Sequence, residues 1–321
     1  MQYKCGVCGN TTDNTSLIAR EMMLGIKEDF EYFQCSNCGC LQLKDIPANM
    51  GRYYPKEDYY SLKKENIKKL KPVKKYIKGL RANWNFSSKK NLLGGFINLF
   101  YKPKPIFGWL KCGGVELTSS ILDVGCGSGG LLLKLREEGF LNNRLVGIDP
   151  FIQEDINYSN GVTILKKTLS EIDEKFDFIM MHHSFEHMKN PQEVMKSLSR
   201  ILTDRGVALI RVPLASSHAY RKYGNCWVQL DAPRHLYLHT VRSIEILAKN
   251  ANLTIPDIKY DSGDFQFYGS ELYQRGISLK DTEGDAKAFF SNKVIRSFQK
   301  EADRLNQIGD GDQAGFYLRK E

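Results

Sequence analysis

Residues 120–139 constrain the fold more than any other part of the chain. An apolar run that contains Asp123 is followed by a cluster of glycines, at positions Gly125, Gly127, Gly129 and Gly130. Residues 131–138 then have the composition of a helix, which ends at Gly139. This order predicts a strand, a glycine turn and a helix, which is how a nucleotide-binding α/β sheet begins. Glycines allow a ligand to approach the backbone closely, and the start of the helix offers free N–H groups to an anionic group.

Two ligand-binding patterns fit this turn. The glycines alone match the G-x-G-x-x-G of dinucleotide sites, whereas together with Asp123 they match D-x-G-x-G-x-G, which is typical of proteins that bind S-adenosylmethionine. Both patterns require an acid at the end of the next strand for ribose hydroxyls, and Asp149 follows Gly129 by 20 residues. Asp123 favours the second pattern, because a carboxylate is unfavourable beside a pyrophosphate but suits the amino group of a methionine moiety. An NAD-dependent enzyme and a turn without a ligand are the alternatives.

Length and composition limit the class of protein. The 321 residues are enough for one large and one small domain, and 42% of them are hydrophobic. No run of 18 apolar residues occurs, and the first residues lack the apolar region of a signal peptide. We therefore expect a cytoplasmic protein without a transmembrane segment. Its eight cysteines then indicate metal ligands or reduced thiols instead of disulfides.

Two C-x-x-C-G motifs near the N-terminus predict a metal site. They comprise Cys5, Cys8, Cys35 and Cys38, and 26 residues separate the pairs. Each tight C-x-x-C turn allows two thiolates to reach one ion, and four thiolates complete a closed, tetrahedral Zn²⁺ site. We therefore predict a structural zinc module at residues 1–46, with Cys40 as a spare thiol. A redox dithiol is the alternative.

A basic region follows the predicted module. Residues 63–104 contain 13 Lys or Arg and a single acid, Glu65, so this stretch carries a net charge of +12 and the remainder of the chain about −3. Apolar residues recur in it every three or four positions from Ile67 to Leu80, which predicts an amphipathic helix with Pro72 as a break. Residues 47–115 are thus an aromatic and basic helical linker. It would act as a cover with a solvated lysine face, a lid over an anionic substrate, a peripheral membrane contact through 63–104, or a nucleic-acid patch.

From residue 116 onward, strands and helices alternate. This pattern predicts an α/β, Rossmann-like domain over 116–321 with a parallel sheet whose ligands bind at the carboxyl ends of the strands. A seventh strand, at 314–319, would be antiparallel and inserted between the fifth and sixth. The other strands are expected at 120–124, 144–148, 162–165, 176–181, 206–212 and 251–261. Helices are expected at 191–202, 241–250 and 283–307.

Several histidines follow the fourth predicted strand. His183, Glu186 and His187 match the H-x-x-E-H pattern of some metalloproteases. That metal site needs one continuous helix, whereas this segment lies between a strand and Pro191, a residue that commonly opens a helix. We therefore reject a metalloprotease.

The same segment resembles a known family. Phe176–Ile179, Glu186-His187 and Asn190-Pro191 are similar to the "fDlI…LEH…dP" stretch of class I S-adenosylmethionine-dependent methyltransferases, and the glycine turn and Asp149 lie in the same order as in that family. The resemblance covers about residues 116–260. It implies that Asp123, Gly125, Cys126, Gly127 and Gly129 hold the methionine part and that Asp149 and Pro150 lie at the ribose. It also implies that Thr168 and Leu169 flank the adenine, and that His182 and His183 lie beside the sulfonium.

A zinc module before such a domain resembles bacterial methyltransferases of deoxysugar and surface-polysaccharide pathways. The sugar C-methyltransferases of that group have a further C-terminal domain, for which this chain is too short, so we expect a hydroxyl acceptor on a sugar or glycolipid. A ribosomal RNA methyltransferase that uses the zinc module and the basic segment is the alternative, although the strand-four segment differs from the type used for base amino groups. A cofactor-binding protein without catalysis is a third possibility.

Two histidines are candidates for the base that deprotonates the acceptor. A Pro-Arg-His-Leu-Tyr segment, which recurs in this group of methyltransferases, contains His235 in a loop beyond the fifth strand. Such a loop borders the pocket, and a histidine titrates near neutrality. His187 is the second candidate. Their structural alternatives are bracing of the loop for His235 and a capping role for His187.

Overall fold

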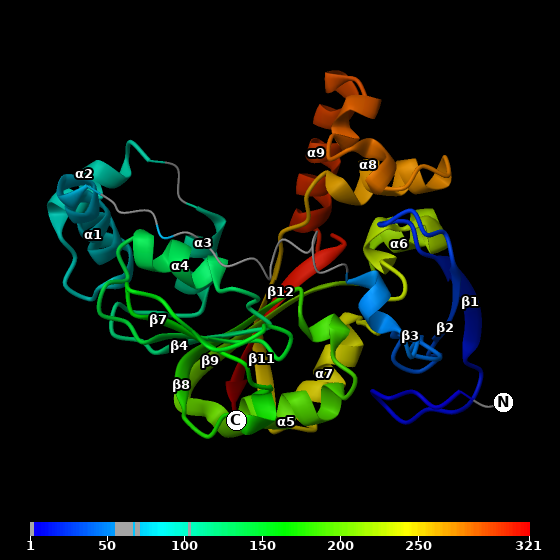
Figure 1. Ribbon diagram of the computed structural model, residues 1–321, viewed down its shortest axis with the longest axis horizontal. Coiled ribbons are helices and arrows are strands. Elements are labelled where there is room, and N and C mark those ends of the chain that lie inside the picture. The colour runs from blue at the N-terminus through cyan, green and yellow to red at the C-terminus, as the bar shows by residue number, and fades with distance from the viewer. Residues whose placement is uncertain (1–2, 55–66, 68–70, 102–103) are drawn as a thin grey trace.

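The computed structural model describes residues 3–54, 67, 71–101 and 104–321. Two sheets organise these residues (Figure 1). The larger sheet has eight strands in the order β11-β12-β9-β8-β4-β5-β7-β6, and the smaller has four in the order β1-β2-β3-β10. Among the described helices, none combines the length and the apolar composition needed to cross a bilayer.

The larger sheet confirms the predicted Rossmann-like topology, with one difference in the count. β4, β5, β7, β8 and β9 run parallel, and β12 lies antiparallel between β9 and β11. Eight strands replace the expected seven, because Gly161 at φ 80° closes a tight turn that lets a two-residue strand pair with β7. The bounds are β4 Ile121–Val124, β5 Leu145–Ile148, β6 Ile156–Asn157, β7 Val162–Leu165, β8 Phe176–His182, β9 Leu202–Pro213, β11 Leu253–Tyr260 and β12 Gln313–Lys320.

Helices cover both faces of this sheet (Figure 1). Alternate residues of β8 face opposite sides, as the period of a strand requires. Ile179 and Met181 pack in the same core as α5 and α7, whereas Phe178 and Met180 pack with α3 and α4. The continuous apolar character of these strands therefore reflects burial on both faces. The bounds are α3 Pro105–Cys112, α4 Gly130–Glu137, α5 Pro191–Ile201 and α7 Val241–Lys249.

The smaller sheet joins the N-terminal residues to a distant part of the chain. β1 (Thr15–Arg20), β2 (Asp29–Gln34) and β3 (Leu41–Leu43) form an antiparallel meander. β10 (Tyr237–Leu238) pairs with β3, so two residues of the predicted 116–321 domain complete the sheet of the predicted 1–46 module. The boundary between these two units is crossed by backbone hydrogen bonds.

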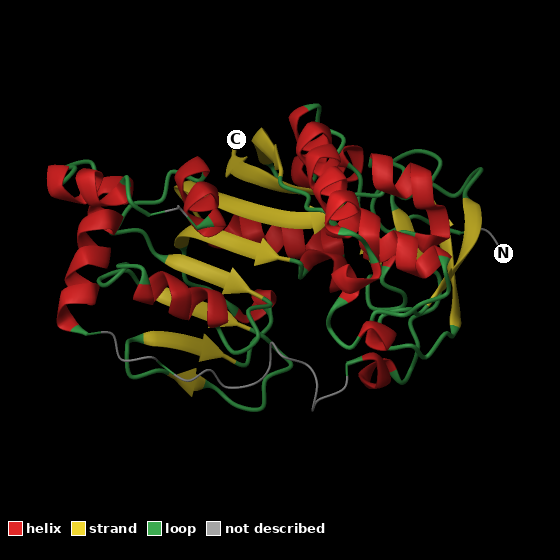
Figure 2. Ribbon diagram, turned by 90° about the horizontal axis from the view of Figure 1, so that it is seen from above, coloured by secondary structure: helices red, strands yellow, loops and turns green. Residues whose placement is uncertain are grey.

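Part of the basic segment is helical. α1 (Pro72–Phe86) and α2 (Leu92–Asn98) pack against each other at one end of the molecule (Figure 2). Pro72 opens α1 instead of breaking a helix, because the first helical turn does not need a proline N–H. Residues 55–66 and 68–70, which include the first basic cluster and Tyr59 and Tyr60, lie outside the described residues.

Three further helices complete the described chain. They are α6 (His218–Tyr223), α8 (Phe265–Gln274) and α9 (Asn292–Gln307). The helix expected at 283–307 begins only at Asn292, because Gly284 at φ 85° interrupts the preceding residues and the Ser291 side chain caps the later start. α8 falls in the aromatic and glycine-rich stretch 262–282, to which the sequence pattern assigned no element.

Candidate active site

The glycine turn forms at the carboxyl end of β4, as predicted. Gly125, Gly127 and Gly129 have φ values of 73°, 55° and 85°, in the left-handed region that disfavours side chains. A Cβ atom at Gly125 would lie 2.5 Å from the Ser184 Cβ atom, and one at Gly129 would lie 2.4 Å from the Cδ1 atom of Ile164. Both backbone conformation and space therefore require glycine, and α4 begins directly after the turn.

Asp149 braces this turn from the end of β5. Its Oδ2 atom accepts a hydrogen bond of 2.9 Å from the Gly127 N–H, and its Oδ1 atom accepts one of 2.9 Å from the Phe151 N–H. The side chain is buried. The carboxylate that was expected to bind a ribose thus also sets the shape of the loop that would surround the ligand.

Asp123 is a buried carboxyl group beside the turn. Burial, and secondly the negative charge of Asp149, raise the pKa of Asp123 to about 7. Among the residues that the structure describes, no cation pairs with either of these two buried acids, which lie at the ends of adjacent strands. A ligand that carries an ammonium group would relieve this imbalance, so the donor set fits the amino group of a methionine moiety.

His182 is the last residue of strand β8, and His183 follows it next to a polar network. The His182 ring lies 4.5 Å from the Trp109 ring, and burial, followed by the charge of Arg211, lowers its pKa to about 3. His183 has a φ of 48°, which is rare outside glycine and asparagine-like residues and marks a strained position. Its Nε2 atom lies 2.6 Å from Nη1 of Arg211. Because a guanidinium only donates, that nitrogen accepts and the His183 proton lies on Nδ1.

The Nδ1–H group of His183 faces the carboxylate of Glu186. The side chain is fully buried, and His183 Nδ1 lies 3.3 Å from its Oε1 atom. Neither carboxylate oxygen accepts a hydrogen bond of normal geometry from the residues that the structure describes. Burial raises the pKa of Glu186, but the interaction with His183 and the neighbouring imidazoles outweighs it and lowers the pKa to about 2. Glu186 is therefore an ionised carboxylate at neutral pH.

His187 and His235 lie next to Glu186, with their ring centroids 4.8 Å apart. Nδ1 of His235 lies 2.7 Å from the Gln229 carbonyl oxygen, and Nδ1 of His187 lies 2.8 Å from that of Arg234. A carbonyl oxygen can only accept a hydrogen bond. In the neutral form of each ring the proton therefore lies on Nδ1, and the Nε2 atom carries an unshared electron pair. Nε2 of His235 is 3.8 Å from Glu186 Oε1.

Burial keeps His235 neutral. Despite the nearby negative charge of Asp231, burial lowers the pKa of His235 to about 4. The chain thus places the unprotonated Nε2 atom of His235 beside an ionised carboxylate. Ligand atoms of Glu186, His187 and His235 lie within 4.8 Å of one another, a spacing at which a metal ion as well as a proton can be held. Glu186 and His187 belong to a three-residue 3-10 turn instead of the helix that H-x-x-E-H requires, as expected.

A model of the family described as "Methyltransferase domain" matches residues 82–257, more than half of the chain. This chain belongs to that family. It is an S-adenosylmethionine-dependent methyltransferase of class I, with the Rossmann-like sheet described above.

Curated relatives of this methyltransferase are similar over part of their length. The ubiquinone biosynthesis O-methyltransferase of Rickettsia bellii is 28% identical over 153 residues, which cover 43% of this chain and 63% of that protein. The tRNA U34 carboxymethyltransferase of Aliarcobacter butzleri is 27% identical over 173 residues, which cover 48% and 49%. The chain thus spans less than two thirds of these relatives. The cyclopropane synthase MmaA2 of Mycobacterium tuberculosis is a solved structure with a TM-score of 0.43 and 16% identity, covering 78% of this chain and 95% of that one.

The other residues predicted to hold the cofactor lie around the same edge of the methyltransferase sheet. Thr168 is exposed and begins a short turn in which its hydroxyl donates to Glu171. Leu169 is buried in the core that contains α5 and α7. Cys126 is half-buried in the glycine turn, and Pro150 is exposed. Their roles at the adenine, methionine and ribose stay predictions.

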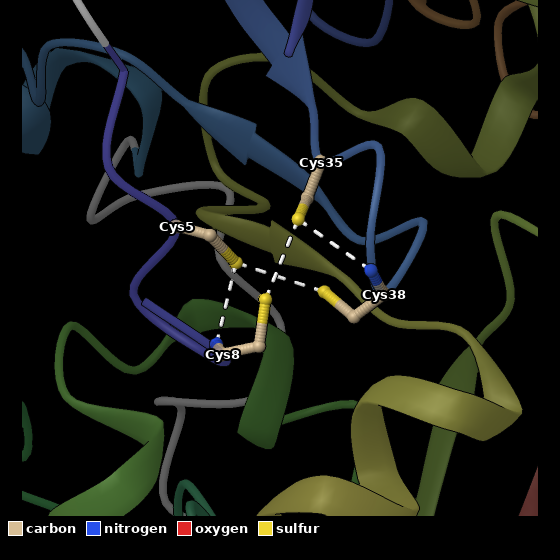
Figure 3. Close-up of side chains that lie close together, drawn as sticks. All are labelled: Cys5, Cys8, Cys35 and Cys38. Carbon is tan, nitrogen blue, oxygen red and sulfur yellow. Dashed lines mark hydrogen bonds between the residues drawn. The ribbon is translucent and has the colours of Figure 1, made fainter. Parts of the chain in front are cut away.

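The four predicted zinc ligands come together in the N-terminal module (Figure 3). The Sγ atoms of Cys5 and Cys38 are 3.6 Å apart, those of Cys8 and Cys35 are 3.5 Å apart, and all four lie within 4.8 Å of one another. Gly9 and Gly39, directly after the pairs, have φ values of 75° and 73°, which is why glycine follows each C-x-x-C. Cys40 is buried outside this cluster, 4.0 Å from His239. Four convergent thiols fit a tetrahedral zinc ion.

The N-terminal module also supports the loop that contains His235. The Tyr32 hydroxyl on β2 donates a 2.8 Å hydrogen bond to the His235 carbonyl oxygen. Leu236 N–H donates to the Glu186 carbonyl oxygen, and Leu43 N–H donates to that of Leu236. The loop is therefore clamped between the module and the end of β8.

Three polar residues near the site escaped the sequence analysis. Arg211 donates from Nε to Asp261 at 2.8 Å, and the indole N–H of Trp109 donates to the same carboxylate at 3.0 Å. An arginine at the end of an apolar strand was the available signal for Arg211. Trp109 and Asp261 are far from it in the sequence, so only the fold brings the three together.

Proposed function

We propose that this methyltransferase transfers a methyl group to a hydroxyl of a sugar or glycolipid in surface-polysaccharide biosynthesis. The observation that carries a hydroxyl acceptor is the arrangement of His235 and His187: Nε2 of His235 lies 3.8 Å from Oε1 of the ionised Glu186, and the His187 ring lies beside that of His235. The Rickettsia relative, named as an O-methyltransferase, supports the same chemistry. The sugar or glycolipid rests on the resemblance of the cysteine module and the sheet domain to enzymes of those pathways.

The proposed roles of the cofactor residues follow from their chemistry. Asp123 would bind the amino group and the glycine turn the carboxylate of the methionine part. Asp149 would bind ribose hydroxyls, Thr168 and Leu169 would flank the adenine, and His182 and His183 would lie beside the sulfonium. When bound, S-adenosylmethionine supplies an electrophilic methyl group. The protein then has to hold the acceptor in line with it and exclude water.

His235 is the proposed base. Its Nε2 atom is unprotonated at neutral pH, and it would take the hydroxyl proton as the new oxygen–carbon bond forms. The negative charge of Glu186, 3.8 Å away, would stabilise the resulting imidazolium. His187, in van der Waals range of the same ring, is the second candidate for this role. His183 would act as a positioning residue, because its Nδ1–H faces Glu186.

A structural zinc ion in the cysteine cluster completes the proposal. A module of this length is too small for a large apolar core of its own, so four zinc–thiolate bonds would supply much of its folding energy. The chain boundaries of the module, at 1–46, of the linker, at 47–115, and of the sheet domain, at 116–321, remain predictions, as does a cytoplasmic location.

Calorimetric titration of the full chain with S-adenosylhomocysteine, with NADH as the control, tests the cofactor half. We expect binding of the first compound alone. Turnover with S-adenosylmethionine would then be measured against sugar nucleotides, lipid-linked sugars and tRNA. Methylation of a sugar hydroxyl supports the proposal, whereas methylation of RNA alone, or of a carbon or nitrogen atom alone, overturns it.

An RNA methyltransferase is the second candidate, favoured by the tRNA-modifying relative and by the basic segment 63–104. Several phosphate contacts would make its RNA affinity fall steeply with salt. Filter binding of tRNA at low and high salt separates the candidates: a steep slope together with methylated tRNA supports RNA, and salt-independent or absent retention excludes it.

A further inference from the structure

Exposed large hydrophobic side chains are concentrated in residues 71–101, which contain the helices α1 and α2. Among the described residues, 14 large hydrophobic side chains are exposed, and eight of them lie within residues 73–101. Leu92 is 81% exposed, Phe96 61% and Leu99 80%. Scattered exposed residues are normal, but a concentration of this kind marks an interaction site. We call residues 71–101 the hairpin.

The packing of α2 explains why these side chains face outward. Gly94 and Gly95 lie against α1: a Cβ atom at Gly94 would be 2.1 Å from the Leu80 carbonyl oxygen, and one at Gly95 would be 2.9 Å from the Trp84 ring. Successive helical residues are rotated by about 100°. Leu92, Leu93 and Phe96 therefore share the opposite side of α2, within an arc of about 100°. One side of this helix is made for close contact with α1 and the other is apolar and uncovered.

The hairpin is also strongly cationic. No aspartate or glutamate occurs from residue 66 to residue 115. Lys71, Lys74, Lys75, Lys89 and Lys90 are exposed and form no ion pair with any residue that the structure describes. An apolar helix face with flanking lysines matches an anionic lipid surface, in which apolar side chains enter the acyl boundary and lysines remain among the headgroups.

The hairpin is firmly joined to the sheet domain. Glu138, which is buried directly after α4, pairs with Lys78 at 2.9 Å and Lys104 at 2.7 Å, and Arg81 lies 3.7 Å away. The Phe86 ring packs 4.9 Å from that of Phe140. These contacts are at the end of α4, whereas the glycine turn is at its beginning. A surface bound to the hairpin would therefore leave the cofactor residues uncovered.

We propose that the hairpin docks this methyltransferase onto an anionic lipid bilayer. A second copy of the chain is disfavoured as the occupant, because two such surfaces would bring together ten unpaired lysines. RNA is disfavoured because phosphates do not use the apolar face of α2. The proposal does not rest on the nature of the methyl acceptor.

Sedimentation of the purified full chain with vesicles tests this proposal. We expect binding to vesicles of phosphatidylglycerol and phosphatidylcholine, weaker binding to phosphatidylcholine alone, and a decrease with salt as the lysines are screened. Each lysine near an anionic surface contributes roughly a fivefold factor in affinity. The double variant Lys74→Glu/Lys75→Glu should therefore bind at least about tenfold more weakly, and Leu92→Ser/Phe96→Ser should show a similar loss.

Matched variants separate docking from general effects. Ile308→Ser removes an exposed apolar residue elsewhere, and Lys249→Glu/Lys293→Glu makes the same change in net charge elsewhere. Both should bind vesicles like the natural protein. Every variant should keep its affinity for S-adenosylhomocysteine, which shows that the fold is intact and keeps the result independent of the proposed acceptor.

Several results would overturn the proposal. One is that the natural protein sediments with neither kind of vesicle. Another is that the hairpin variants and the control variants lose vesicle binding to the same extent. A third is that Leu92→Ser/Phe96→Ser still binds vesicles like the natural protein. A dimer in light scattering that this variant converts to a monomer, without vesicle binding, would assign the hairpin to a second copy. Retention of tRNA that depends on Lys74 and Lys75 alone, without vesicle binding, would assign it to RNA.

Discussion

The two halves of the candidate active site are built in different ways. The proposed cofactor half comprises the glycine turn, Asp123 and Asp149, which all lie within 30 residues at the ends of two adjacent strands. The proposed acceptor half comprises Glu186, His187 and His235, and the loop that contains His235 is held by Tyr32 and β3 of the cysteine module. The first half is local and belongs to the sheet alone, whereas the second depends on residues about 200 positions away.

This difference separates two kinds of control over the reaction. As proposed, cofactor binding would need only the backbone geometry of the glycine turn and two acids, which the sheet itself provides. Placement of the acceptor would need the N-terminal module, because the Thr240 hydroxyl donates to the Cys38 carbonyl oxygen at 2.6 Å and the β3–β10 pair lies beside the His235 loop. On this proposal the cysteine module would support catalysis without contributing a reacting group, a division that can be tested by substitution.

Loss of the cysteine cluster is expected to have the largest effect. A structural zinc site of this type contributes on the order of 10 kcal/mol to folding, so Cys35→Ser/Cys38→Ser should unfold the module and displace the His235 loop. Turnover should fall by about a thousandfold or more, because the variant would lose both the rate contribution of the general base and that of its alignment with the acceptor. Affinity for S-adenosylhomocysteine should change less than about threefold, since the residues proposed to bind it lie on the sheet domain and not on the cysteine module. The exposed Cys112→Ser is the control, and a parallel loss of cofactor affinity would contradict the comparison.

His235→Ala should affect only the acceptor half. A positioned general base contributes about 10²–10⁴-fold to a rate, so turnover should fall by roughly a hundredfold or more while calorimetry with S-adenosylhomocysteine is unchanged. His218→Ala, outside the site, should retain full turnover. If His235→Ala is as active as the natural protein, His235 is not the base and His187→Ala becomes the decisive variant.

Asp123 gives the cofactor half its own dependence on pH. Its pKa in the folded protein, about 7, is above the ordinary carboxyl value of 3.8. Between pH 4 and pH 7 the folded protein holds the Asp123 proton more tightly than the unfolded chain does. The free energy of unfolding is therefore highest below pH 4 and decreases by up to about 4 kcal/mol as the pH rises to 7. The melting temperature of the cofactor-free protein should fall from pH 5 to pH 8, and the melting temperature of the Asp123→Asn variant should fall less over the same range. Affinity for S-adenosylhomocysteine should rise over this range only in the natural protein; identical profiles would exclude Asp123 as the partner of the amino group.

Tyr32→Phe should have the smallest effect. It removes one hydrogen bond between the module and the His235 carbonyl oxygen, which costs about 1 kcal/mol in free energy of unfolding. Turnover should decrease a few-fold, with cofactor affinity unchanged. Urea unfolding and steady-state rates measure both, with Tyr268→Phe on α8 as the control. A change in cofactor affinity as large as the change in turnover would show that the two halves are coupled.

The residues of the proposed cofactor half could be predicted from the sequence, whereas those of the proposed acceptor half could be predicted only in part. The glycine turn, Asp149 and the C-x-x-C pairs are defined by spacings of a few residues, and the antiparallel last strand follows from the family topology. The tautomers of His187 and His235 depend on the Arg234 and Gln229 carbonyl oxygens, whose positions no periodicity specifies. Short strands such as β6 and β10 escaped prediction because two residues give no recognisable alternation.

The pairing of β3 with β10 also has a consequence for synthesis of the chain on the ribosome. The strand β3 ends at Leu43, and its partner Tyr237 emerges nearly 200 residues later. At about 5–20 residues per second, the edge of β3 waits roughly 10–40 s for its neighbour. During that interval the nascent module presents an uncovered edge, which is a template for pairing with other chains. Early capture of a metal ion by the cysteines would order this meander while it waits.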